Sequence, residues 1–95
     1  VTYAQTISFI TRAMKAQGYW VDQPSGALPA GVPAAHQTDV RTFTFYTGGV
    51  PAFTGSWDGS ATRGWFARAL WAALDAYWGR DAALNSGTNA GGFVP

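Results

Sequence analysis

The stretch ATRGWFARALWAALDAYWG, residues 61–79, decides the fold, because it is a helix whose bulky side chains point in several directions. Trp71 and Trp78 are seven residues apart and share one flank, and Trp65 falls on the other flank. No single packing surface covers both flanks and the stripe between them, so the helix needs more than one kind of cover. At 100° per residue the central stripe consists of Phe66, Leu70, Ala73, Leu74 and Tyr77.

The ends of this helix carry recognisable signals. Thr62 is a suitable N-cap residue, and Gly79 is placed to end the helix. Beyond it lies RDAALNSGTNAGGFVP, residues 80–95, which we interpret as a Gly-rich tail. Its single apolar tip, Phe93 and Val94, is predicted to contact a neighbouring copy of the chain.

A second helix is predicted within residues 1–20. Thr2 and Gln5 have the spacing of a capping box, and Gly18 is placed to end the helix. We expect its apolar stripe to pack against that of the 61–79 helix, and its opposite face to be polar. The stripe is Tyr3, Ile7, Ile10 and Met14, and the polar face is Ser8, Arg12 and Lys15.

Residues 21–60 are rich in Pro and Gly and predict long irregular connections. Within them, TDVRTFTFYTGG (38–49) has the Thr and Phe content of a strand. Its Thr-Asp start and its Gly pair equally suit a short helix. Both interpretations stay open on the residues alone, and Phe43 and Phe45 are expected to join the core in either case.

Composition excludes several classes of protein. Ninety-five residues make one small domain, and 12% of them are charged, against roughly 25% in an average soluble domain. A net charge of +1 argues against binding to nucleic acid, and no apolar run is long enough to span a membrane. The absence of cysteine excludes disulfides and thiolate metal sites. The start at Val1 indicates a processed product or part of a longer protein.

No pattern of catalytic residues is visible. His36 is the only histidine, and neither a serine motif nor a suitably placed acid accompanies it. We therefore expect a loop histidine that makes local hydrogen bonds. The five aspartates are scattered, and WDGS (57–60) is interpreted as a turn rather than a calcium loop. The sequence predicts a protein that is not an enzyme and has no metal or cofactor.

A faint internal repeat leads to a family resemblance. An offset of sixty residues aligns Thr2 with Thr62 and keeps the apolar stripes in register. VTYAQTISFITRAM (1–14) and ATRGWFARALWAAL (61–74) both resemble the closing helix of an S-layer homology repeat. Between them, TDVRTFTFYTGGV (38–50) resembles the opening helix, and SWDGS (56–60) the turn before the closing helix.

The resemblance implies a mainly α domain over residues 1–79, followed by the 80–95 tail. Residues 1–20 would be the closing helix of a first repeat, and 38–79 a nearly complete second repeat. This fold has two long amphipathic helices, a shorter middle helix and long Pro/Gly-rich connections. In the family, such domains attach prokaryotic surface proteins to cell-wall polysaccharide, and Arg63 matches the arginine that commonly contacts the sugar. Tyr3 and Trp65 depart from the family's Thr-Arg-Ala-Glu box.

Three kinds of cover are open for the flank tryptophans: the irregular 21–60 block, another subunit, or a sugar ring. We expect a structural, extracellular cell-surface protein of a prokaryote, which self-assembles into a layer or filament. The predicted subunit contacts are Trp65, Trp71, Trp78, Phe93 and Val94. The alternative is a carbohydrate-binding anchor module that uses Arg63, Trp65 and Trp71. Arg63 fits that role because a cation in the first turn opposes the helix dipole, which indicates another function.

Overall fold

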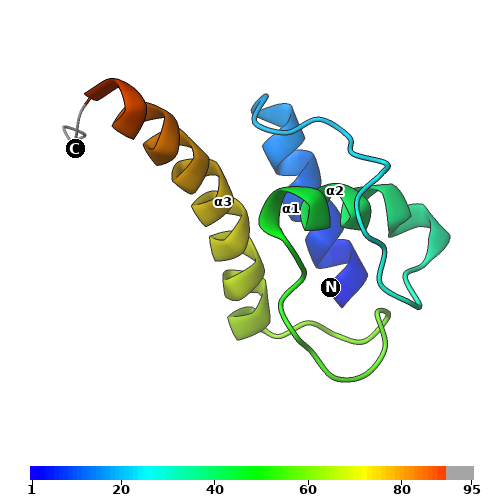
Figure 1. Ribbon diagram of the computed structural model, residues 1–95. Coiled ribbons are helices and arrows are strands. Elements are labelled where there is room, and N and C mark those ends of the chain that lie inside the picture. The colour runs from blue at the N-terminus through cyan, green and yellow to red at the C-terminus, as the bar shows by residue number, and fades with distance from the viewer. Residues whose placement is uncertain (90–95) are drawn as a thin grey trace.

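The computed structural model describes the backbone of residues 1–89 and the side chains through Gly79. This part of the chain contains three α-helices. The described residues form no strand, and their one β-type contact is an isolated bridge between Thr2 and Ser60. The helices α1 and α2 pack together, and α3 runs beside them (Figure 1). The predicted mainly α fold, with its shorter middle helix, is confirmed. The helix bounds are α1 Tyr3–Ala16, α2 Gln37–Thr47 and α3 Arg63–Asn89, with a short 3-10 turn, Ala34–His36, before α2.

The helices α1 and α3 begin where their cap residues predict. The backbone N–H of Gln5 donates to Thr2 Oγ1 at 3.0 Å, and the N–H of Thr2 donates to Gln5 Oε1 at 2.9 Å. Thr62 Oγ1 likewise accepts from the N–H of Trp65 at 3.1 Å. Residues 38–47, for which strand and helix were both open, belong to α2, which ends at Gly48 in the left-handed conformation.

The core forms where α1 meets α2 and α3. The α1 stripe is buried as predicted, since Ile7, Ile10 and Met14 are each less than 5% exposed and Tyr3 is half-buried. From α2, Phe43 is fully buried, but Phe45 is 53% exposed. The prediction that Phe45 joins the core is wrong, because it lies two residues from Phe43, about 200° around the helix.

The helix α3 is rotated relative to the predicted stripe. Its fully buried positions are Trp65, Ala69 and Ala73, whereas Leu70 is 38% exposed. Of the predicted stripe, only Ala73 is fully buried, and Leu74 and Tyr77 pack against the core partly exposed. Small side chains at Ala69 and Ala73 let α3 lie close to the rest of the domain, which leaves larger apolar residues on its outer side.

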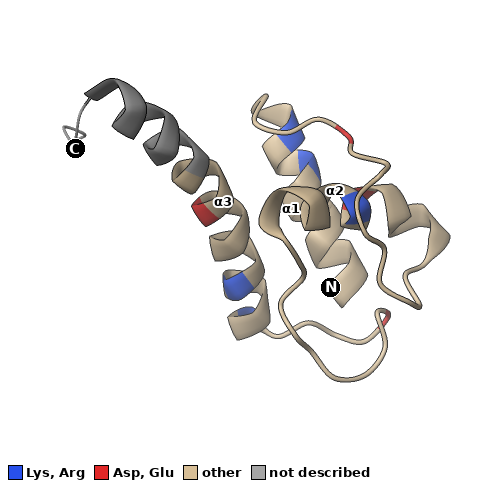
Figure 2. Ribbon diagram, viewed as in Figure 1, with Lys and Arg blue, Asp and Glu red and all other residues tan. Residues whose placement is uncertain are grey.

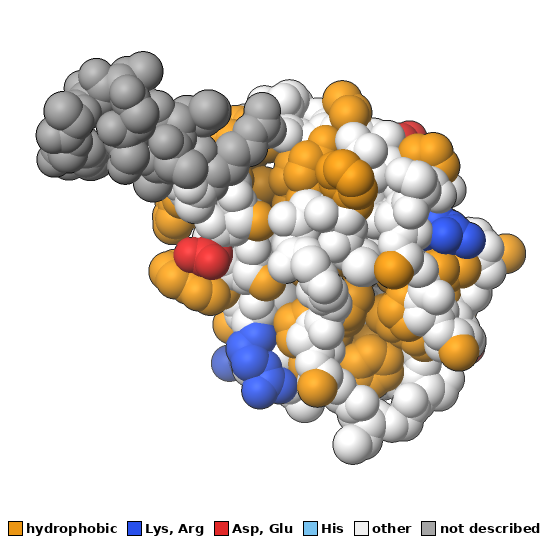
Figure 3. Space-filling view, viewed as in Figure 1, with side chains coloured by type: hydrophobic (Ala, Val, Ile, Leu, Met, Phe, Trp, Pro, Cys, Tyr) orange, Lys and Arg blue, Asp and Glu red, His pale blue; other side chains and the backbone are white. Residues whose placement is uncertain are grey.

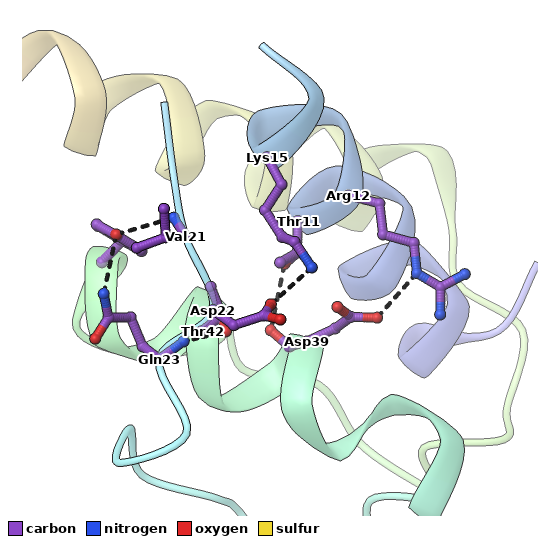
Figure 4. A network of polar contacts seen from close by, with 9 residues as sticks. Thr11, Arg12, Lys15, Val21, Asp22, Gln23, Asp39 and Thr42 are labelled. Atoms are coloured by element: carbon purple, nitrogen blue, oxygen red, sulfur yellow. Dashed lines mark hydrogen bonds and ion pairs between the residues drawn. The ribbon is translucent and has the colours of Figure 1, made fainter. Parts of the chain in front are cut away.

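The face of α1 opposite its apolar stripe is only partly open to water, since Arg12 is exposed but Lys15 is partly buried. Ser8 is buried, contrary to the prediction of a polar exposed face. Arg12 Nε donates to Asp39 Oδ2 of α2 at 3.1 Å, and Lys15 Nζ lies 2.6 Å from Asp22 Oδ1 of the following connection. These contacts tie α2 and residues 21–23 to α1 (Figure 4).

Of the three flank tryptophans, the irregular 21–60 block covers only Trp65, through Pro51 and Ala52, and it also covers Trp20 and Trp57. The indole N–H of Trp57 donates to the Ala30 carbonyl at 3.2 Å, and Trp20 stacks on Tyr46 with ring centroids 4.8 Å apart. Both indoles are buried. This cover is built from Pro/Gly-rich chain that wraps over the helices (Figure 1).

Gly79 does not end α3, which continues to Asn89. The predicted tail therefore begins as helix, and the boundary predicted at residue 79 is wrong. A glycine inside a helix costs only about 1 kcal/mol relative to alanine, and the residues that follow, Arg-Asp-Ala-Ala-Leu, mostly favour the helix. Phe93 and Val94 lie outside the described residues.

Candidate interaction surface

The outer side of α3 carries a second apolar face, which we call the outer seam: Ala67, Trp71, Leu74 and Trp78, of which Leu74 is also partly packed against the core. Trp71 is 62% exposed and Trp78 is 53% exposed, so the domain's own chain leaves most of the flank that these two residues share uncovered. Leu70 borders the outer seam and is 38% exposed. The helix is thus apolar on two sides, and the domain covers only one of them. Hydrophobic side chains occupy much of the drawn surface of the molecule (Figure 3).

The two exposed tryptophans contact each other. Their ring centroids are 6.3 Å apart and their planes meet at 77°, an edge-to-face arrangement that aromatic pairs prefer. Trp71 and Trp78 therefore meet edge to face rather than in a stack. The contact restrains both side chains before any partner arrives, which lowers the entropy cost of binding.

Charged residues border the outer seam on one edge. Arg68 and Asp75 are exposed, seven residues apart on the same side of α3, and neither forms an ion pair with the side chains that the structure describes. The basic and acidic positions of α3 lie apart from each other along the helix (Figure 2). A partner that covers the outer seam would meet one positive and one negative group along this edge.

Trp65 lies inside the domain and takes no part in this surface. It is 2% exposed, and its indole N–H donates to the carbonyls of Pro51 and Ala52 at 3.1 and 3.2 Å. Its ring packs edge-on against Tyr3 and Phe53. The prediction that Trp65 contacts another subunit or, in the alternative, a sugar is wrong, because the domain's own chain covers its indole.

Two apolar hollows are both lined by Val1 and Phe66, and only the smaller one reaches the outer seam, at Ala67. The larger, about 560 Å³, runs between α1 and α3 past Phe9, which is 64% exposed. The smaller, about 320 Å³, includes Arg63, Ala67 and Leu70. Arg63 is exposed, as its predicted roles require, and lies at the edge of the apolar surface.

His36 makes one local hydrogen bond, from its backbone N–H to the Pro33 carbonyl at 2.9 Å, but its side chain contacts a distant segment. Its Nδ1 lies 2.6 Å from Ser8 Oγ, 28 residues away in the chain, at the wall of the larger hollow. The sequence analysis missed this pair because nothing local marks Ser8 as its partner. The nearby Asp39 carboxylate accepts from Arg12, and no carboxylate hydrogen-bonds to His36 among the described side chains. The pair links α1 to the turn before α2.

The searched part of the chain contains no group of three or more His, Asp or Glu side chains placed to hold a metal ion. Within the described residues, none of the helices has the length and hydropathy needed to cross a membrane. Comparisons of the chain with protein-family models, curated proteins and solved structures find no match.

Proposed function

We propose that this chain is a non-enzymatic structural protein of a prokaryotic cell surface, which assembles extracellularly into a layer or filament through aromatic contacts between copies. One observation carries the proposal: the domain covers Trp20, Trp57 and Trp65 with its own chain, yet leaves Trp71 and Trp78 more than half exposed. A monomer gains nothing from two exposed indoles, whereas subunit interfaces are enriched in tryptophan.

The size of the outer seam supports contact with another macromolecule. Exposed portions of the two indoles amount to roughly 250–300 Å² per copy, taking about 250 Å² for a whole Trp side chain. A standard interface buries about 800 Å² per partner, so the outer seam needs its apolar neighbours, Leu70 and Leu74, to contribute. We therefore expect the copies to associate in a concentration-dependent way rather than to form an obligate complex.

A layer or filament also needs a second contact surface, because a two-fold contact alone produces closed dimers. Phe9, Phe45 and Val21 are 64%, 53% and 64% exposed and lie off α3. They supply apolar surface away from the outer seam. The resemblance of residues 1–78 to S-layer homology repeats supports a cell-surface role, since repeats of that family commonly pack in threes and this chain has about one and a half.

The proposal predicts that Trp71→Ala combined with Trp78→Ala abolishes assembly while the fold is retained, because both side chains are exposed and alanine favours the helix. Electron microscopy and size-exclusion chromatography of the purified chain measure this. The control is Thr54→Ala, at an exposed position of the connection before α3 that belongs to neither apolar surface. Polymers that form equally well from the double variant would contradict the proposal.

The same preparations test the polysaccharide alternative, which the exposed position of Arg63 beside the smaller hollow favours. In that case the chain stays monomeric and is retained on purified cell-wall sacculi, and Arg63→Ala abolishes retention. Under our proposal Arg63→Ala leaves assembly almost unchanged. If the chain is a monomer that sacculi retain through Arg63, the assembly proposal is wrong and the anchoring function takes its place.

A further inference from the structure

Residues of the outer seam repeat at the spacing of a coiled-coil contact. Ala67, Trp71, Leu74 and Trp78 are separated by four, three and four residues, which is the a/d pattern of a heptad. These four residues lie on a helix of 27 residues, which is long enough to pack against another helix over several turns. The side of α3 that the domain leaves uncovered therefore has the residue spacing that packs against a second helix.

We infer that the partner is a second copy of α3, packed antiparallel about a two-fold axis. In this pair the two-fold axis passes between residues 72 and 73 of both copies. Trp71 then lies opposite Leu74 of the second copy, and Trp78 lies opposite its Ala67. Each large indole thus meets a smaller side chain, and the two copies make the same contacts in reverse, as a two-fold interface requires.

Charge complementarity along the edge of the outer seam selects this orientation. With Trp71 at an a position, Arg68 and Asp75 both occupy e positions, which border the seam. A two-fold axis perpendicular to the helices brings this edge of one copy against the same edge of the other, in the opposite direction. Arg68 of each copy then faces Asp75 of the other, giving two ion pairs. A parallel pair would instead place the e edge against the g edge, where Leu70 and Tyr77 lie.

Leu70 and Tyr77 occupy the g positions and make the opposite edge apolar. Leu70 is 38% exposed and extends the apolar contact toward the smaller hollow, which it lines together with Ala67. The antiparallel pair therefore has one charged edge and one apolar edge. This asymmetry disfavours a rotated or shifted pairing, because a shift of one heptad would bring Arg68 against Arg68 or Asp75 against Asp75.

This pairing rests on the proposed self-assembly, and exchanging charges tests it separately. Arg68→Asp alone and Asp75→Arg alone should each weaken dimerisation about tenfold or more, since every ion pair becomes a like-charge contact. Mixing the two variants should restore dimers of near wild-type affinity that contain one copy of each. Native mass spectrometry distinguishes these mixed dimers from the two homodimers. Asp58→Arg, on an exposed turn away from α3, is the control with the same change of charge.

Cysteine pairing gives an independent check of the register, because the chain has no cysteine of its own. An equimolar mixture of Arg68→Cys and Asp75→Cys should form mainly the mixed disulfide. At 1.5 Å per residue, the 68–68 pair lies about 14 Å apart along the axis and the 75–75 pair about 8 Å apart, whereas the 68–75 pair lies only about 3 Å apart. If the wild type assembles but the mixtures restore nothing and show no preference for mixed dimers, the antiparallel pairing is wrong and the assembly proposal stands. A strictly monomeric wild type would overturn both.

Discussion

Replacing Trp65 by Ala is expected to lower the free energy of unfolding by about 3–5 kcal/mol, the usual cost of emptying a large buried aromatic site. Its indole is 2% exposed and donates to the carbonyls of Pro51 and Ala52, so the substitution leaves both a cavity and unpaired acceptors. Small domains have only about 5–15 kcal/mol of stability in total, so this variant is close to unfolding.

Urea denaturation followed by circular dichroism measures the loss, in dilute solution where association contributes nothing. Trp71→Ala is the matched control: it is the same substitution on the same helix at a 62% exposed site, with an expected change of about 0.5 kcal/mol or less. Trp65→Phe should fall between the two, because the ring remains while the N–H donor is lost. Equal effects at positions 65 and 71 would contradict the orientation of α3 described above.

Gly26→Ala is expected to destabilise the domain by about 3 kcal/mol, at the upper end of the usual cost of overpacking. A Cβ at this position would lie 2.0 Å from the carbonyl oxygen of Arg41 and 2.8 Å from its carbonyl carbon. These are backbone atoms of α2 and cannot rotate away. The guanidinium of Arg41 also donates to the Gly26 carbonyl at 2.8 Å, so displacement of the loop breaks this bond as well.

Gly49→Ala provides the comparison, since a Cβ there would meet nothing within 4 Å. Thermal unfolding monitored by circular dichroism should show a lower midpoint for Gly26→Ala and a midpoint near wild type for Gly49→Ala. Similar midpoints for the two variants would show that the 21–33 connection does not lie against α2 as closely as described.

Local patterns predicted α1 and α3 and their starts well, whereas they left residues 38–47 open between strand and helix. The capping box of Thr2 and Gln5 and the cap at Thr62 depend on residues three apart, so the sequence contains all the information that they need. The α1 stripe was equally predictable, because only one face of that helix is strongly apolar. The end of α3 was not, since a single glycine is a weak stop signal when helix-forming residues follow it.

The orientation of α3 could not be predicted from periodicity. Both sides of this helix are apolar, so its pattern fits two stripes, one through Leu70 and Leu74 and one through Trp65, Ala69 and Ala73. The choice depends on the carbonyls of residues 51 and 52, which accept from the Trp65 indole and belong to a loop without periodic pattern. The contact of Ser8 with His36 was missed for a similar reason: it joins two segments that only the tertiary fold brings together.

The central claim is that another copy of the chain covers the apolar face that α3 turns away from its own domain. Sedimentation equilibrium of the unmodified protein, from micromolar to millimolar concentration, tests it most directly. The average mass should rise with concentration from 10.1 kDa to at least twice that value. A mass that stays at 10.1 kDa throughout this range would show that Trp71 and Trp78 remain exposed, and would contradict the claim.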